Sequence, residues 1–102
     1  MTRLLLKPGA NRFAENKEEA KRIRLNQIMP ALERGERVIL DFKPISYATQ
    51  SYVHALIGEA LQKHGEDALR KLEFKNCSPA LRSVIELVVD YTLGGFSDRQ
   101  SP

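Results

Sequence analysis

Short apolar runs alternate along the chain with longer segments in which apolar residues recur at helical spacing. The runs at residues 3–7, 37–42 and 71–75 are brief and bounded by polar or turn residues, which predicts three strands. The segments 14–33, 49–64 and 79–93 repeat apolar residues every three or four positions, which predicts three helices. Strands that alternate with helices predict an α/β fold, in which right-handed crossover helices join parallel strands of a central sheet.

The middle strand is apolar without alternation, at Val38, Ile39 and Leu40. A strand that is apolar on both faces is typical of the centre of a parallel sheet covered by helices on both sides. The last strand is different, because Leu72 and Phe74 share one face by the two-residue period. We therefore expect residues 38–42 to lie at the centre of the sheet and to be buried.

Each predicted helix carries an apolar stripe and a recognisable boundary. Pro30 lies inside the first helix and predicts a kink or a second short helix there, and Gly35 predicts its end. Ser78 and Pro79 predict the start of the last helix, with Ser78 as the capping residue, and Gly94-Gly95 its end. The stripes comprise Leu25, Ile28, Met29 and Leu32; Val53, Leu56, Ile57, Ala60 and Leu61; and Leu81, Val84, Ile85 and Val88.

Length and composition predict one soluble domain. The chain has 102 residues, of which 42% are hydrophobic and 28% are charged. We expect a single domain over residues 1–93 and a flexible tail over residues 94–102. No apolar run is long enough for a membrane helix or a signal peptide, and the single Cys77 suits a reducing compartment. These features predict a cytoplasmic protein without a membrane partner.

The positive charge is concentrated at one end of the sequence. The net charge is +3, and residues 1–24 hold seven basic and three acidic side chains. One interpretation is a patch that binds nucleic acid or an acidic partner. The other is a solvated helix face, which the possible ion pair of Glu18 with Arg22 and the lack of interleaved aromatic residues favour. The cluster comprises Arg12, Lys17, Lys21, Arg22 and Arg24.

Few residues have the spacing that catalysis or metal binding requires. His54 and His64 lie ten positions apart and have no cysteine or carboxylate at ligand spacing, so no metal or cofactor is expected. Cys77 precedes a helix, which can lower the pKa of a thiol, but a small buried residue is the interpretation that we favour. We expect no enzyme, because the sequence offers no convergent set of catalytic groups. A deep pocket lined by Asp41, His54 or Cys77 would instead indicate an enzyme.

The carboxyl ends of the strands are the expected place for a ligand or a partner. They lie at residues 41–51 and 76–78, where two helix N-termini with unpaired N–H groups are predicted to meet. Short motifs mark these ends: Asp41-Phe42 at the end of the strand, Gln50-Ser51-Tyr52 at the start of the helix, and Asn-x-Ser at residues 76–78.

With these motifs, residues 35–92 resemble the STAS domains of bacterial anti-sigma factor antagonists. They are still more similar to the STAS-like family of unassigned function. The resemblance implies a small STAS-like sandwich that acts as a regulatory, non-enzymatic protein-binding module. It also implies a partner with a histidine-kinase-like ATPase fold, which acts as a serine kinase.

In the antagonists, that kinase phosphorylates a serine at the start of the helix after the central strand. This serine corresponds to Ser51 here. The chain departs from the antagonists at Thr49, where they have Asp, and at Tyr52, where they have Gly. Its N-terminal third also differs, with one strand and a long basic helix in place of a β-hairpin.

Residues 45–54 are therefore the expected partner-binding segment, with Ser51 as the candidate phosphoacceptor. A simpler alternative is that Thr49 or Ser51 only caps the helix. The expected partner-binding residues are Tyr47, Thr49, Gln50, Ser51, Tyr52, Asn76 and Ser78.

Overall fold

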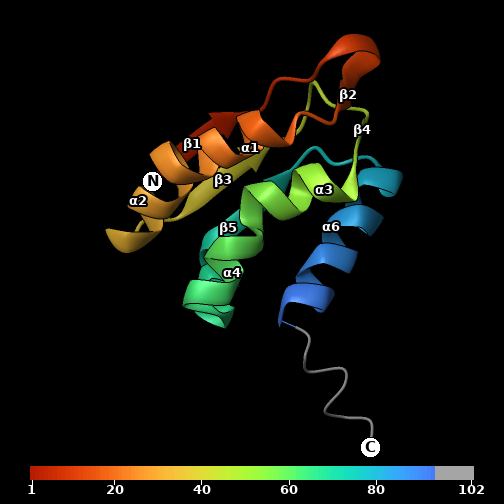
Figure 1. Ribbon diagram of the computed structural model, residues 1–102. Coiled ribbons are helices and arrows are strands. Elements are labelled where there is room, and N and C mark those ends of the chain that lie inside the picture. Colours follow the sequence, from red (N-terminus) through yellow and green to blue (C-terminus); the bar gives the residue numbers. More distant parts are fainter. Residues whose placement is uncertain (94–102) are drawn as a thin grey trace, which may run out of the picture.

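The computed structural model describes residues 1–93, which form one sheet of three strands, a separate pair of short strands, and a series of helices (Figure 1). The strands are β1 (Thr2–Leu5), β2 (Phe13–Ala14), β3 (Val38–Asp41), β4 (Tyr47–Ala48) and β5 (Leu72–Lys75). The α-helices are α1 (Lys17–Ile23), α2 (Met29–Glu33), α3 (Gln50–Val53), α4 (Glu59–His64), α5 (Glu66–Lys71) and α6 (Pro79–Leu93). A 3₁₀ turn, η1 (Ala10–Arg12), and two π-helical segments, η2 (Arg24–Ile28) and η3 (His54–Gly58), complete the order.

The main sheet is parallel and has the strand order β1-β3-β5. Val38 pairs with Thr2 on one side and with Leu72 on the other, so β3 is central, as its apolar sequence predicts. The second sheet is the parallel pair β2-β4, which follows β1 and β3 and lies beyond their carboxyl ends (Figure 1). The prediction of an α/β fold with a mainly parallel central sheet is confirmed.

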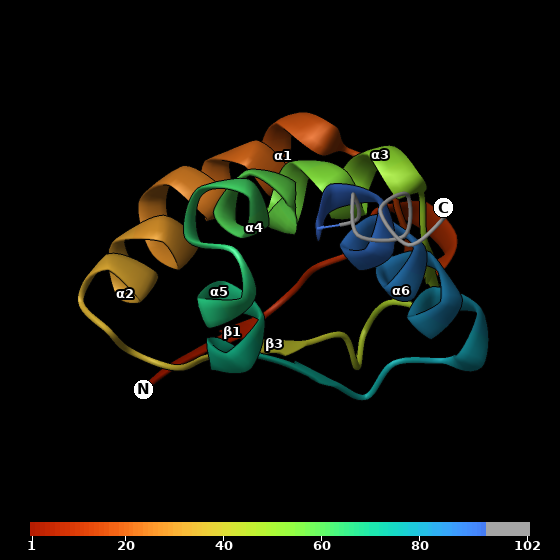
Figure 2. The same ribbon diagram turned by 90° about the horizontal axis from the view of Figure 1, so that it is seen from below.

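The helices cover only one face of the main sheet (Figure 2). The expectation that helices cover β3 on both faces is therefore wrong. The physical reason is the strand order: when each successive crossover is right-handed and moves in the same direction, every helix falls on the same side. The covered face holds Leu4, Val38 and Leu40, whereas Arg3 and Leu5 are exposed on the other face.

All three residues of the Val38–Leu40 run are nevertheless buried, as predicted. Val38 and Leu40 belong to the contiguous hydrophobic core, and Ile39 does not. Ile39 lies in register between Arg3 and Glu73, on the two neighbouring strands, and is 7% exposed. Its burial therefore comes from its position in the middle of the sheet and does not require a second helical layer.

The first helical segment begins later than predicted, because Asn16 caps α1 by accepting bonds from the N–H groups of Glu18 and Glu19. The predicted interruption at Pro30 is confirmed, since the π-helical η2 gives way to α2 with Pro30 in its first turn. The π turn also shifts the buried face. Leu25 is 52% exposed instead of buried, and Arg24 is buried in its place.

Sequence periodicity missed the shortest elements. Strands β2 and β4 have two residues each, and α5 lies between the predicted helix 49–64 and the predicted strand 71–75, where no helix is predicted. The last helix begins at Pro79 behind Ser78, as predicted, and buries Leu81, Ile85 and Val88. Gly94-Gly95 and the predicted tail lie outside the described residues.

Within residues 1–93, no helix has the length and apolar character that a membrane span requires.

Candidate functional site

Asp41, at the carboxyl end of the central strand, bonds to side chains from or next to both neighbouring strands of the main sheet. Its carboxylate accepts a bond from Arg3 Nη2 of β1 at 2.8 Å and one from Asn76 Nδ2, just after β5, at 2.8 Å. It also accepts the backbone N–H of Lys43 at 2.9 Å, which turns the chain away from β3. Asp41 is 4% exposed, so the group is a buried but fully bonded carboxylate.

These bonds favour the ionised form of Asp41. The amide of Asn76 contributes most to lowering the pKa of Asp41 below its usual value, followed by the N–H of Lys43 and by Arg3. Asn76 adopts a φ of 60° to present its amide, a conformation that asparagine tolerates better than most residues. The side chain of Asn76, an expected partner contact, therefore serves an internal bond.

Ser78 also makes internal bonds. Its Oγ accepts the N–H of Leu81 at 3.1 Å, which confirms it as the cap of α6. The same hydroxyl donates to the carbonyl of Ser46 at 2.9 Å and so joins the two loops at the carboxyl edge of the sheet.

The β2-β4 pair holds the loop that follows β3. The backbone N–H of Ser46 donates to the carbonyl of Arg12, and that of Thr49 donates to the carbonyl of Ala14. Above this pair, the ring of Tyr47 stacks on that of Phe13 at 5.7 Å with an interplanar angle of 4°. Tyr47 remains 40% exposed, so one face of the stack is available at the surface.

Thr49 is the residue that caps the helix. Its Oγ1 accepts the N–H of Tyr52 at 3.1 Å, and its backbone is extended as a cap requires. Ser51 lies in the first turn, is exposed, and its hydroxyl has no hydrogen-bond partner among residues 1–93. Ser51 is therefore not the cap of α3, and Thr49 is.

Tyr52 does not belong to the exposed surface, so that expectation is wrong. Its side chain is 1% exposed and lies in the core. The sequence held a signal for this, because Tyr52 precedes Leu56 by four positions and Val53 is its neighbour in the same apolar stripe. Burial, and secondarily the charge of Glu19, raises the pKa of Tyr52 to about 12.

Ser51 lies on the wall of an open groove of about 490 Å³. The groove is formed where the starts of α1 and α3 approach the end of α6. No carboxylate is among the side chains that line it, which are Lys17, Gln50, Ser51, His54, Ala55 and Tyr91. Sequence analysis missed Lys17 and Tyr91 as members of this site, because they come from helices far from Ser51 along the chain.

The groove combines hydrogen-bond donors with an exposed aromatic ring. Tyr91 is 72% exposed at the end of α6, and Lys17 brings a positive charge from the first turn of α1. The ring of His54 lies against Gly58, where a Cβ atom would come within 2.9 Å of it. Gly58 therefore gives room for the orientation of His54 at the groove.

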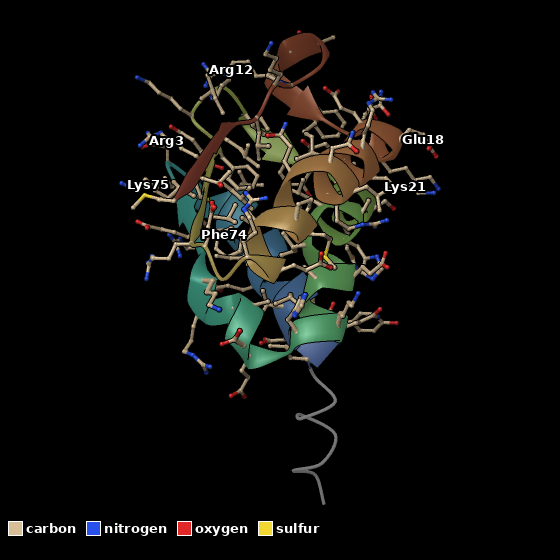
Figure 3. All side chains as sticks on the ribbon, turned by 90° about the vertical axis from the view of Figure 1, so that its left-hand side faces the viewer. Arg3, Arg12, Glu18, Lys21, Phe74 and Lys75 are labelled. Carbon is tan, nitrogen blue, oxygen red and sulfur yellow. The ribbon has the colours of Figure 1, made fainter. Side chains whose placement is uncertain are left out.

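The basic cluster is smaller in the structure than in the sequence. Arg24 is 9% exposed, donates to the carbonyl of Ala55 at 3.1 Å and pairs with Glu59 at 3.1 Å. Arg12 donates to the carbonyl of Lys43. Lys21 projects from the helical side of the molecule beside Glu18, whereas Arg3 and Lys75 project from the uncovered side of the sheet (Figure 3). The five basic residues therefore do not form one stripe.

Cys77 is half-buried, and desolvation raises the pKa of its thiol. This environment fits a small packed residue, the interpretation that the sequence favours. Cys77 lines a small, mostly apolar cavity of about 170 Å³ together with Phe74 and Ile85. His54 lines the open groove, and Asp41 is enclosed by its own bonds.

Residues 19–82 match a family described as a STAS-like domain of unknown function. The match runs from within α1 to the first turn of α6 and includes Asp41, Asn76, Thr49 and Ser51, whereas Arg3 of β1 lies outside it. No curated protein matched the chain. No solved structure matched it either.

Proposed function

The chain belongs to the family of STAS-like domains of unknown function, and from this premise we propose that it is a regulatory protein-binding module. Its binding surface comprises Tyr47, Gln50 and Ser51 together with the groove lined by Lys17, His54 and Tyr91. Its partner is an ATPase or serine kinase with the histidine-kinase-like ATPase fold, and phosphorylation of Ser51 controls the interaction. The domain itself performs no catalysis.

One observation carries this proposal: the hydroxyl of Ser51 is exposed, and the helix cap is Thr49. A serine in the first helical turn that served the fold would be expected to cap or to pack. Since Thr49 already satisfies the N–H of Tyr52, the exposed Ser51 hydroxyl is free for a kinase to reach.

The surroundings of Ser51 would tolerate a phosphate. The first helical turn offers unpaired backbone N–H groups and a partial positive charge. Lys17 lines the same groove and adds a full positive charge. The folded domain should therefore accept the modification, while two added negative charges change the surface that a partner meets.

The test begins with isolation of the partner by affinity capture from the native cell, followed by calorimetric titration. Ser51→Asp is expected to leave the domain folded and to weaken binding at least ~10-fold, about 1.4 kcal/mol. Ser51→Ala is expected to bind as the wild type does. Mass spectrometry of the domain after incubation with the partner and ATP is expected to locate the phosphate on Ser51.

Ser83 is a matched control, because it is an exposed serine on α6 that lies outside the groove. Ser83→Asp should not alter the affinity. Equal affinities of Ser51→Asp and the wild type for the partner would contradict the switch, and capture of nucleic acid in place of a protein would contradict the binding module.

A further inference from the structure

A third cavity lies between the loop after β1 and the start of α1. It has a volume of about 210 Å³. Gly9 closes the loop by donating its N–H to the carbonyl of Phe13 at 2.9 Å, and a Cβ atom at Gly9 would meet that carbonyl at 3.3 Å. The cavity is separate from the groove, since the two share no lining residue. Its polar side chains are Lys7, Glu15, Asn16, Glu19 and Tyr52.

The side chain of Tyr52 reaches this cavity from the core. Its hydroxyl oxygen is buried and has no hydrogen-bond partner among the described residues. A buried hydroxyl without a partner costs about 1–3 kcal/mol, so most buried polar groups are paired. A ligand that forms a hydrogen bond with the Tyr52 hydroxyl would therefore remove this free-energy cost.

The charges around the hydroxyl are also unpaired. Glu19 is half-buried, lies near enough to Tyr52 to influence its ionisation, and forms no ion pair within residues 1–93. Glu15 adds a second carboxylate, and Lys7 supplies one ammonium group. Asn16 is engaged in capping α1.

Size and charge together restrict the chemistry of a ligand. A volume of about 210 Å³ is below the roughly 300–1,000 Å³ of sites that take drug-sized molecules and cofactors. Two carboxylates favour an ammonium group, whereas Lys7 and the Tyr52 hydroxyl favour an acceptor such as a carboxylate. A purely anionic ligand would leave the two carboxylates without a partner, and a purely cationic ligand would leave Lys7 without one.

We propose that this cavity binds a small zwitterion of the amino-acid type, with its ammonium group toward Glu19 and Glu15 and its carboxylate toward Lys7 and the Tyr52 hydroxyl. The site does not depend on Ser51 or on a protein partner. Because the bound molecule would contact both the loop at Gly9 and the first turns of α1, it would fix α1 against that loop.

The test is an NMR titration of the ¹⁵N-labelled full chain with each of the twenty L-amino acids, with inorganic phosphate as a purely anionic control. At least one amino acid is expected to shift the backbone amides of Gly9, Glu19 and Tyr52. For that amino acid, the amide derivative and the N-acetyl derivative each lack one charge and are expected to bind at least ~10-fold more weakly.

Two variants separate the site from the fold. Tyr52→Phe keeps the ring and removes the hydroxyl, and Glu19→Gln keeps the shape and removes the charge; each is expected to weaken binding ~10-fold or more without lowering Tm. Glu18→Gln is the matched control, because Glu18 is the exposed neighbour outside the cavity, and should bind as the wild type does. The proposal would be overturned by the absence of any shift at these amides, or by binding that persists unchanged in Tyr52→Phe and Glu19→Gln.

Discussion

Three residues within four positions of the chain have different physical roles. Thr49 caps the start of α3, Ser51 presents a free hydroxyl at the groove, and the side chain of Tyr52 packs in the core. The chain departs from the anti-sigma factor antagonists at Thr49 and Tyr52, and both departures have a structural explanation. Threonine performs the capping that aspartate also can perform, and tyrosine contributes buried apolar area that glycine lacks.

Removal of the two hydroxyls should therefore have unequal effects on stability. Thr49→Ala is expected to lower the free energy of unfolding by about 1 kcal/mol, because it leaves the N–H of Tyr52 without its acceptor. Ser51→Ala is expected to change it by less than about 0.5 kcal/mol. Urea unfolding of both variants measures the difference, and equal losses would contradict the assignment of Thr49 as the cap.

Tyr52 should make the stability of the domain sensitive to alkaline pH. The pKa of Tyr52 is about 12 in the folded state, and an exposed tyrosine ionises near pH 10. Its contribution is therefore fully present below about pH 10 and is lost as the pH rises toward 12, since ionisation then favours the unfolded chain. Unfolding curves of the wild type and Tyr52→Phe at pH 8 to 11 are expected to diverge above pH 10, with the wild type losing more stability.

At the scale of the element, the first helical segment shows how one irregular turn changes the surface. The π-helical η2 places Arg24 inside and Leu25 outside. The guanidinium of Arg24 binds the carbonyl of Ala55, which belongs to the neighbouring π-helical η3. One buried arginine thus connects the two irregular segments of adjacent helices.

The arginines and lysines of this segment should respond differently to substitution. Arg24→Ala is expected to cost about 1–3 kcal/mol, because it removes a largely buried side chain together with its bond to the carbonyl of Ala55 and its ion pair with Glu59. The double change of Lys21 and Arg22 to Glu is expected to alter stability by less than about 1 kcal/mol and to leave partner affinity nearly unchanged. Loss of binding in the double variant, with its circular dichroism spectrum intact, would favour the electrostatic-patch interpretation.

At the scale of the whole molecule, the strand order decides which face of the sheet is covered. Leu40 points into the core below the helices, and Ile39 lies on the uncovered face. Leu40→Ala is expected to lower the free energy of unfolding by about 2–5 kcal/mol. Ile39→Ala should cost clearly less, because its neighbours are the in-register side chains of Arg3 and Glu73 and no helix packs on it. Chemical denaturation of the two variants compares them, and equal losses would contradict the single helical layer.

Elements that depend on local composition could be predicted from the sequence, whereas those that depend on tertiary packing could not. The strand at Val38–Asp41 and the start of α6 at Ser78-Pro79 follow from local composition, and the structure confirms both. Strands of two residues have no periodicity to detect, and the exposure of Leu25 depends on a π turn that no short motif signals. The residues of the candidate site follow the same rule. The position of Ser51 at the start of a helix could be predicted from the local motif, whereas the approach of Lys17 and Tyr91 depends on the packing of three helices.

The register of the parallel sheet also constrains the order in which the chain can fold. Every pair in β1-β3 and β3-β5 joins residues more than 30 positions apart, so each strand pairing closes a large loop. The entropy of closing such loops must be overcome before the strands gain their hydrogen bonds. Early formation of the intervening helices would shorten that search, so we expect the helices to form first and the pairing of the strands to be the slow step. This domain should accordingly refold more slowly than a helical bundle of equal length. Substitutions in the middle of β3 should slow refolding more than substitutions in the loops at the carboxyl edge of the sheet.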